Sequence, residues 1–309
     1  MSSLLVVGSV AFDTIHNQTG THRRILGGSA TYASIAASMF SPVRLVGVVG
    51  KDFPPAAVDM LRDKGVDVSG LEIAEGETFH WEGRYSDDLT SRTSLCTELN
   101  VFAQFQPKIP PAFRDSPFVM LGNIDPELQL DVLEQVSKPM LVVADTMNFW
   151  IEGKPKELAR TLEKVDVLVI NEEEARQLAR EHNLVRVAKQ LLKMGPRVAI
   201  IKKGEHGALC FEGDEVFSAP AYPLFDVVDP TGAGDTFAGG LVGWLAHRGQ
   251  TTHHAMRRGI VYGSTLASFC VEGMGIERLT GVARQDVDAR YAQFRTLVHV
   301  ATDEELSQT

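Results

Sequence analysis

Short apolar runs that end in glycine or just before a polar residue recur along the chain. They lie at residues 4–8, 43–50, 118–122, 140–144, 167–170 and 198–204. Runs of this length and composition predict buried parallel strands. Stretches with the spacing of one helical face stand between or after them, at 53–64, 127–137, 253–269 and 285–297. This alternation predicts an α/β protein with a doubly wound sheet flanked by helices.

Two further patterns depart from that rhythm. Residues 78–85 and 92–105 are rich in aromatic and β-branched side chains and interrupt the alternation of strands and helices. Residues 208–211 and 215–219 are expected to form a hairpin. The chain therefore contains β structure beyond its parallel sheet.

Residues 229–240, which read DPTGAGDTFAGG, carry the strongest functional signal. Gly232, Ala233 and Gly234 have almost no side chain, so another molecule can approach their backbone closely. A helix is expected to begin here, because Phe237 opens the spacing of one helical face. The N–H groups of its first turn and the positive end of its dipole form a site for an anion.

Asp235 places a carboxylate beside this anion site. That makes chemical sense if the carboxylate takes a proton from a nucleophile about to attack the anion, as phosphoryl transfer requires. The simpler interpretation is a first-turn charge that complements the helix dipole. Two other glycine motifs do not fit, because Phe237 stands where a dinucleotide fingerprint needs a small residue and no lysine follows Gly234 as in a Walker loop.

Residues 229–240 resemble the C-terminal signature of the ribokinase/PfkB family of sugar and nucleoside kinases, and the resemblance extends over most of the chain. It implies a single ribokinase-like domain over residues 1–309. It also implies a small β-sheet lid, formed mainly by about 75–106 plus part of 11–25, which excludes water from the reaction. Asp235 is then the catalytic base, and the amides of residues 232–234 stabilise the moving phosphoryl group.

The acceptor site is expected near the N-terminus. Asp13 follows the first apolar run, and its carboxylate can accept two hydroxyl hydrogens of a sugar; it matches the family's substrate aspartate, although a loop aspartate is the other interpretation. Gly27 and Gly28 precede a small-residue helix at 33–39 and resemble the family's first signature. Tyr32 stands where ribokinase has a substrate-binding asparagine, so this tyrosine is expected to reshape the pocket.

Nucleotide and metal contacts follow from the same resemblance. Asn171 and Glu174 have the spacing of a helix cap with a reciprocal glutamate, and the family adds a role in holding water around Mg²⁺ and the triphosphate. Asp145, after its strand, resembles a family motif behind the phosphate site, and a loop cap explains it equally well. The residues assigned to the nucleotide are Asn171, Glu174, Lys202, Gly204, Thr231, Val271 and Gly275.

Asp229 and Thr231 match positions that line a monovalent-cation site in several relatives. The sequence leaves open whether such an ion, for example K⁺, is used. The net charge of −10 argues against a nucleic-acid-binding surface. No apolar run is long enough to span a bilayer, and the three cysteines form neither a metal pattern nor a disulfide framework. We therefore expect a cytoplasmic protein, with a homodimer through the lid edge as one assembly.

The sequence thus predicts an ATP-dependent kinase that uses Mg²⁺ and phosphorylates a hydroxymethyl group of a sugar or sugar-like acceptor. One alternative is a nucleoside kinase that acts on the ribose 5′-hydroxyl, for which Phe12, Tyr32, Phe79 and Trp81 could supply a stacking surface. The other is a non-catalytic ATP- or sugar-binding regulatory protein. Asp235 and the complete anion cradle argue against this last alternative.

Overall fold

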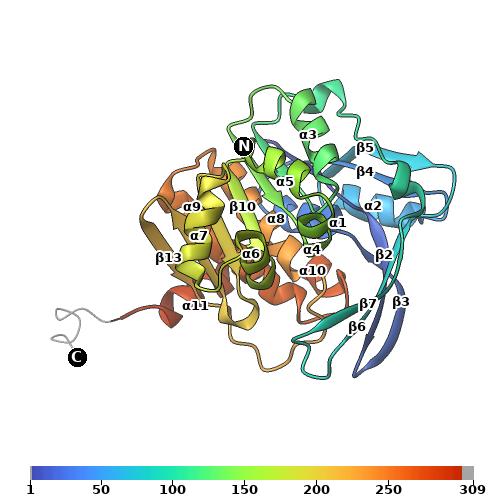
Figure 1. The fold of residues 1–309 in the computed structure, drawn as a ribbon. Helices are drawn as coiled ribbons and strands as arrows, with labels where there is room; N and C mark the ends of the chain where they lie inside the picture. Colours follow the sequence, from blue (N-terminus) through green and yellow to red (C-terminus); the bar gives the residue numbers. More distant parts are fainter. Residues whose placement is uncertain (1, 301–309) are drawn as a thin grey trace.

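The computed structural model describes residues 2–300, which form two β-sheets with helices on both sides of the larger one (Figure 1). The strands are β1 (Leu4–Val7), β2 (Ala11–Asn17), β3 (Gly20–Gly27), β4 (Val43–Gly50), β5 (Val66–Ala74), β6 (Phe79–Tyr85), β7 (Arg92–Glu98), β8 (Phe118–Leu121), β9 (Leu141–Asp145), β10 (Val167–Asn171), β11 (Val198–Lys202), β12 (Ala208–Glu212) and β13 (Glu215–Ala219). The helices are α1 (Ser29–Ser38), α2 (Pro55–Asp63), α3 (Pro126–Gln135), α4 (Asn148–Gly153), α5 (Pro155–Leu162), α6 (Glu172–Ala179), α7 (Leu184–Lys193), α8 (Ala233–Arg248), α9 (His253–Cys270), α10 (Glu277–Gly281) and α11 (Arg284–Leu297). Three 3₁₀ turns lie at Asn100–Gln104, Pro111–Phe113 and Gly204–His206.

The larger sheet confirms the predicted doubly wound α/β class. Its nine strands run in the order β13-β12-β11-β10-β9-β8-β1-β4-β5. All neighbours from β10 and β11 through β4 and β5 pair in parallel, and only β12 and β13 are antiparallel. The strand order reverses at β1, between β8 and β4, and a reversal of this kind opens a ligand crevice at the carboxyl ends of the strands.

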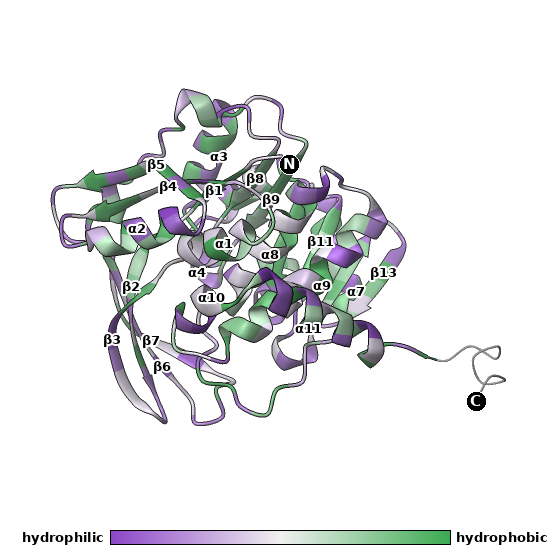
Figure 2. Cartoon of the chain, turned by 180° about the vertical axis from the view of Figure 1, so that it is seen from behind, coloured by the Kyte–Doolittle hydropathy of each residue, from purple (hydrophilic) through white to green (hydrophobic). Residues whose placement is uncertain are grey.

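Both faces of this sheet are covered by helices, so alternate residues of each strand enter two separate cores. In β1, Leu4 and Val6 pack in the core shared with α1, α8 and α9, while Leu5 and Val7 pack with α3, α5, α6 and α7. Figure 2 shows that the strands of the larger sheet are mostly apolar and that the helices covering them contain both apolar and polar residues. This double burial explains why the strands appear as continuous apolar runs. Within residues 2–300, no helix has the length and apolar character needed to cross a bilayer.

Two glycines of α8 bring this helix into backbone contact with α1. A Cβ at Gly239 would lie 2.3 Å from the carbonyl oxygen of Ala33, and one at Gly243 would lie 2.6 Å from Cα of Ala37. Larger residues at either position would push the helices apart. The close crossing fixes the start of α8 beside the ligand crevice.

The smaller sheet has the order β3-β2-β6-β7 and projects from one side of the body (Figure 1). Its strands come from both stretches in which a lid is expected. Ile15, Tyr85 and Met274 form a separate buried cluster that joins this sheet to the last third of the chain. The β7 strand ends at Glu98, because a 3₁₀ turn replaces the expected extended segment at 100–104.

Candidate active site

The loop before α8 has the geometry of the expected anion cradle. Gly232 has φ of 74° and precedes the first residue of the helix, which no side chain caps. The N–H groups of Ala233 and Thr236 donate to the carbonyl oxygens of Pro230 and Gly232, at 3.2 and 2.8 Å. Between them, the N–H groups of Gly234 and Asp235 have no backbone acceptor in the described chain. These two groups and the helix dipole are available to an anion.

Asp235 lies in the first turn of α8, beside those amides. Burial and the nearby carboxylate of Asp145 raise the pKa of Asp235 to about 7, against the opposing effect of Lys202 and Arg92. A carboxylate with a pKa near neutrality is a stronger base than an ordinary aspartate and is still deprotonated in a large fraction of molecules. The position and the pKa both suit proton abstraction.

A buried ion pair stands behind the cradle. Nζ of Lys202, at the end of β11, lies 2.9 Å from Oδ2 of Asp145, at the end of β9. A Cβ added at Gly234 would lie 2.8 Å from the same Nζ, so the ammonium group sits directly against the cradle. Burial lowers the pKa of Lys202, but Asp145 and Glu174 outweigh it and the pKa lies above its ordinary value. Lys202 is therefore a permanent positive charge beside the site.

Asn171 and Glu174 form the helix cap that their spacing predicts. The Glu174 N–H donates to Oδ1 of Asn171 at 2.8 Å, and the Asn171 N–H donates to Oε2 of Glu174 at 3.2 Å. Burial, followed by the charge of Asp145, raises the pKa of Glu174 to about 7, while Lys202 opposes the rise. Asn171 and Glu174 can therefore cap α6 and also lie beside the triphosphate of a bound nucleotide.

Asp13 lies in β2 and is almost fully buried, with 5% of its surface exposed. Burial, followed by the charges of Asp229 and Asp235, raises the pKa of Asp13 to about 8. A Cβ at Gly27 would lie 2.0 Å from its Oδ2, so this glycine makes room for the carboxylate. Gly28 has φ of 92°, and a Cβ there would lie 2.5 Å from the carbonyl oxygen of Ser9. Both glycines thus allow the close packing of the backbone around Asp13 and Ser9.

Tyr32 of α1 lies under the cradle. A Cβ at Gly232 would be 2.4 Å from the far end of the Tyr32 ring, so the ring packs against the backbone at the start of α8. Only 1% of the residue is exposed, and its hydroxyl has no hydrogen-bond partner among residues 2–300. Burial and the nearby Asp13 hold the pKa of Tyr32 well above its ordinary value, so the phenol stays protonated.

Asp229 ties the cradle loop to the loop after α9. Its Oδ1 accepts from the Thr231 N–H at 2.9 Å, and its Oδ2 accepts from the Gly275 N–H at 3.0 Å. The Val271 carbonyl oxygen accepts from the N–H of Val228 at 2.8 Å. The structure therefore brings Thr231, Val271 and Gly275 together around Asp229. Gly204 lies at the end of β11 with φ of 56° and open space on its Cβ side.

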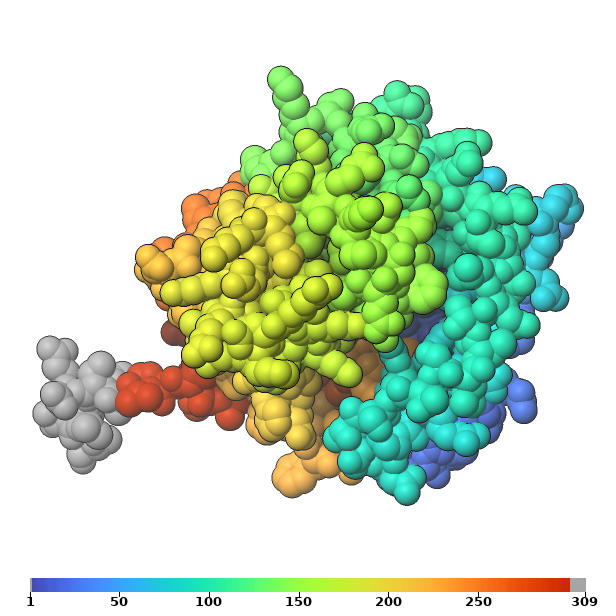
Figure 3. Space-filling model, viewed as in Figure 1, coloured from blue at the N-terminus to red at the C-terminus, as the bar shows by residue number. Residues whose placement is uncertain are grey.

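The smaller sheet, where the lid is expected, contacts this loop directly. The hydroxyl groups of Tyr85 and Thr231 are 2.9 Å apart in a buried hydrogen bond. Asn17, at the end of β2, donates from Nδ2 to the carbonyl oxygen of Val228 at 3.1 Å. In the space-filling view, the teal lid hairpin and the yellow-green body border a recess with orange atoms of the last third of the chain at its floor (Figure 3).

The aromatic residues considered for base stacking already have partners. The Phe12 ring packs on Phe53 at 5.7 Å, and that of Phe79 stacks on Phe102 at 5.4 Å. The guanidinium group of Arg92 lies over the Trp81 ring. The rings of Phe12, Phe79 and Trp81 are thus engaged within the protein, and we assign no base contact to them.

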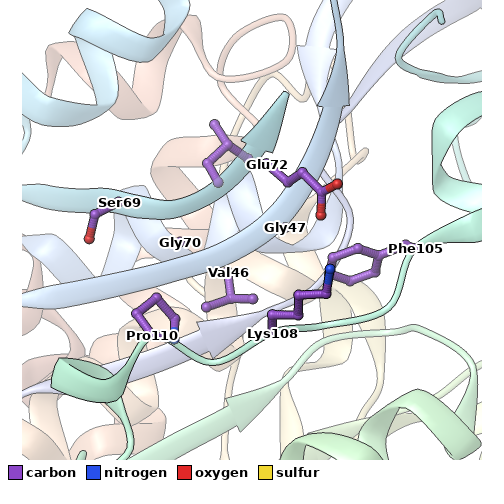
Figure 4. A pocket seen from close by; sticks show the side chains of 9 residues that line it. Val46, Gly47, Ser69, Gly70, Glu72, Phe105, Lys108 and Pro110 are labelled. Carbon is purple, nitrogen blue, oxygen red and sulfur yellow. The ribbon is translucent and has the colours of Figure 1, made fainter. Parts of the chain in front are cut away.

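A cavity of about 170 Å³ lies apart from these residues, where β4 and β5 meet residues 105–110 (Figure 4). Its lining is formed by Val46, Gly47, Ser69, Gly70, Leu71, Glu72, Phe105, Lys108 and Pro110. None of the predicted site residues belongs to it.

Comparisons with known proteins give matches along most of the chain. The model of the pfkB family carbohydrate kinases matches residues 1–277. A cytidine kinase from Thermococcus kodakarensis is 30% identical over 266 residues, which cover 84% of this chain and 94% of that protein.

Solved structures share the fold. The nucleoside kinase of Methanocaldococcus jannaschii superposes with a TM-score of 0.76 at 21% identity, covering 95% of this chain and 99% of its own. The nucleoside kinase of Burkholderia thailandensis, solved in complex with inosine, gives a TM-score of 0.77 at 19% identity, covering 96% and 98%. The ribokinase-like fold of this chain is thereby confirmed.

Proposed function

The chain belongs to the pfkB family of carbohydrate kinases, and we propose that within this family it is a nucleoside kinase. It is an ATP-dependent phosphotransferase with an alcohol group as acceptor. The acceptor we propose is the 5′-hydroxyl of a nucleoside's ribose. The observation that carries this choice is the similarity to a cytidine kinase along nearly its whole length. A nucleoside kinase from Methanocaldococcus jannaschii that is 22% identical over 290 residues supports it, and a free sugar is the second candidate acceptor.

Asp235 is proposed to remove the proton of the acceptor hydroxyl. The acceptor oxygen then bonds to the γ-phosphorus as the bond from that phosphorus to the bridging oxygen breaks, and the bond's electron pair leaves with ADP. Charge on the transferred group is stabilised by the amides of Gly234 and Asp235 and by the ammonium of Lys202. The raised pKa of Asp235 matches its function, because a base works best when its pKa is near the working pH.

The acceptor's ring hydroxyls are proposed to bind Asp13. Its carboxylate forms no hydrogen bond with another described residue, so its lone pairs are available to hydroxyl donors. Gly27 and Gly28 let the sugar approach the backbone at this point. The buried hydroxyl of Tyr32 is a further donor at the same end of the site. Fixed hydroxyls orient the reacting alcohol toward Asp235.

Mg²⁺ is proposed to bind mainly to the ATP phosphates, with water linking it to Asn171 and Glu174. Residues 2–300 contain no group of three or more His, Cys, Asp or Glu side chains placed to hold a metal ion. The oxygen donors present suit an ion that keeps several waters. Mg²⁺ bound there would neutralise negative charge that develops on the phosphates. A monovalent cation near Asp229 stays a prediction, and it is tested by measuring activity with and without K⁺. A homodimer through the lid also stays a prediction, and it is tested by sedimentation.

The acceptor is tested by a panel in which ADP formation is measured with ATP and Mg²⁺. Cytidine, uridine, adenosine, inosine and guanosine are compared with ribose, fructose and myo-inositol. We expect kcat/KM for at least one nucleoside to exceed that for every free sugar. Turnover of a free sugar with none of any nucleoside would overturn the nucleoside proposal. The Asp235→Asn variant serves as the control for contaminating kinases.

A further inference from the structure

One arginine of the lid faces the cradle. Arg92 is the first residue of β7 and pairs with Tyr85 of β6. Paired residues of an antiparallel ladder project from the same face. Tyr85 is the residue whose hydroxyl bonds to Thr231 at 2.9 Å, so that face is the one in contact with the cradle loop.

The lid contains a platform for this arginine. The guanidinium carbon of Arg92 lies 5.2 Å from the centroid of the Trp81 ring. The Trp81 Nε1 group donates to Oγ of Ser94 at 3.1 Å, which fixes the ring's orientation. A Cβ at Gly83 would lie 2.0 Å from the same ring, so only glycine leaves room for it to lie flat on the strand. A cation stacked on a fixed aromatic ring is held in place before its ligand arrives.

The charge of Arg92 reaches the catalytic groups. It lowers the pKa of Asp13, Glu174 and Asp235, against the larger effect of burial. Within residues 2–300, Arg92 contacts Trp81 and Tyr85 but forms no ion pair. The other cation of the site, Lys202, is paired with Asp145. Arg92 is thus a positive charge beside several acids with its charge still unpaired, as expected if its ligand is an anion that enters the site.

We propose that Arg92 is a catalytic residue that binds the γ-phosphoryl group of ATP when the lid is closed. The planar guanidinium matches two oxygens of a phosphoryl group. It offsets the negative charge that spreads over those oxygens during transfer, in addition to the cradle amides and Lys202. Closure of the lid and stabilisation of the transition state are then one event. The proposal rests on the phosphotransferase activity and not on the identity of the acceptor.

The first test measures nucleotide binding without acceptor, by calorimetry with ADP and with a non-hydrolysable ATP analogue in the presence of Mg²⁺. The Arg92→Ala variant is expected to bind the ATP analogue about tenfold more weakly, or worse, and ADP normally. The matched control is Arg84→Ala. Both arginines are exposed, but Arg84 alternates with the buried Gly83 and Tyr85 and so projects from the opposite face of the strand. This control should bind both nucleotides as the unmodified protein does.

The second test measures turnover with the best acceptor of the panel. Arg92→Ala should lower kcat by about 10²-fold or more with little change in the acceptor's KM, and Arg92→Lys should recover part of the loss. Equal loss of ADP and ATP-analogue binding, or the same kcat for the Arg84 and Arg92 variants, would overturn the proposal. If thermal unfolding shows that Arg92→Ala does not fold, kcat of Arg92→Lys is compared with kcat of Arg84→Lys instead. A lower kcat for Arg92→Lys alone supports the proposal, and equal values contradict it. If the acceptor panel favours a free sugar, the nucleoside proposal fails, but the nucleotide-binding and kcat measurements still test the role of Arg92.

Discussion

Three acids of the site, Asp13, Glu174 and Asp235, have pKa values raised to about 8, about 7 and about 7. In each case burial is the largest cause, and neighbouring carboxylates add to it. Such groups are costly to ionise in the empty protein. Positive charge from Mg²⁺ or Arg92, or a proton taken from the acceptor, offsets the negative charge of these carboxylates and lowers the cost of ionising them. The three acids therefore favour the state of the site in which substrates are bound.

The first prediction concerns Asp235. Only its deprotonated form accepts a proton, so kcat should rise with pH through about 7 and then level off. Asp235→Asn should lower kcat by about 10²- to 10⁴-fold with nucleotide binding retained. Steady-state kinetics from pH 5.5 to 9 checks both, with Asp226→Asn, an exposed loop acid, as the control. Near-normal turnover of the Asp235 variant would contradict its role as the base.

A second prediction concerns Asp13 and stability. Its pKa rises from 3.8 in the unfolded chain to about 8 in the fold, so the folded state holds the extra proton. The stability from that proton is complete below pH 3.8 and is lost as pH rises through about 8. Asp13→Asn stays neutral, so its Tm relative to the unmodified protein should increase between pH 6 and pH 9. Acceptor binding should be lost, and a Tm difference independent of pH would contradict the raised pKa.

At the scale of elements, the sequence predicted most of the parallel sheet and the start of α8. Strands buried on both faces are apolar throughout, which makes β1, β4 and β8 to β11 recognisable. Edge strand β5 (Val66–Ala74) escaped notice because half-exposed and exposed residues interrupt its apolar positions. The short helices α4 and α5 escaped because they contain too few turns to show a period. The pairing of Asp145 with Lys202 joins residues 57 apart, and no local pattern encodes that contact.

The third prediction concerns the crossing of α1 and α8. A Cβ added at Gly243 would lie 2.6 Å from Cα of Ala37, so the side chain of Gly243→Leu would clash with α1. Overpacking of this kind destabilises by about 1–3 kcal/mol. Because the crossing fixes the start of α8, kcat should also fall. Thermal unfolding and turnover are compared with Gly281→Ala, at a helical glycine with no atom near its Cβ position. An unchanged Tm for Gly243→Leu would show that the crossing tolerates separation.

At the scale of the whole molecule, the site joins distant parts of the chain. The lid strands belong to the first third, whereas the loop they touch and the cradle belong to the last third (Figure 1). Three contacts hold them together: Tyr85 with Thr231, Asn17 with Val228, and the apolar cluster around Met274. A loss of any one should favour the open lid and admit water to the phosphoryl group.

Tyr85→Phe tests this link with the smallest change. The variant keeps the ring in the apolar cluster but removes the hydroxyl that bonds to Thr231, so the closed lid should lose about 1 kcal/mol. We expect more ATP hydrolysis per phosphorylated acceptor, because water reaches the γ-phosphoryl group more often. The ratio of ADP to phosphorylated acceptor measures this leak. Tyr222→Phe removes a hydroxyl bonded to Gln293, outside the site, and should leave the ratio unchanged. If the ratio also stays unchanged in Tyr85→Phe, water exclusion does not depend on the bond between the lid and the cradle loop.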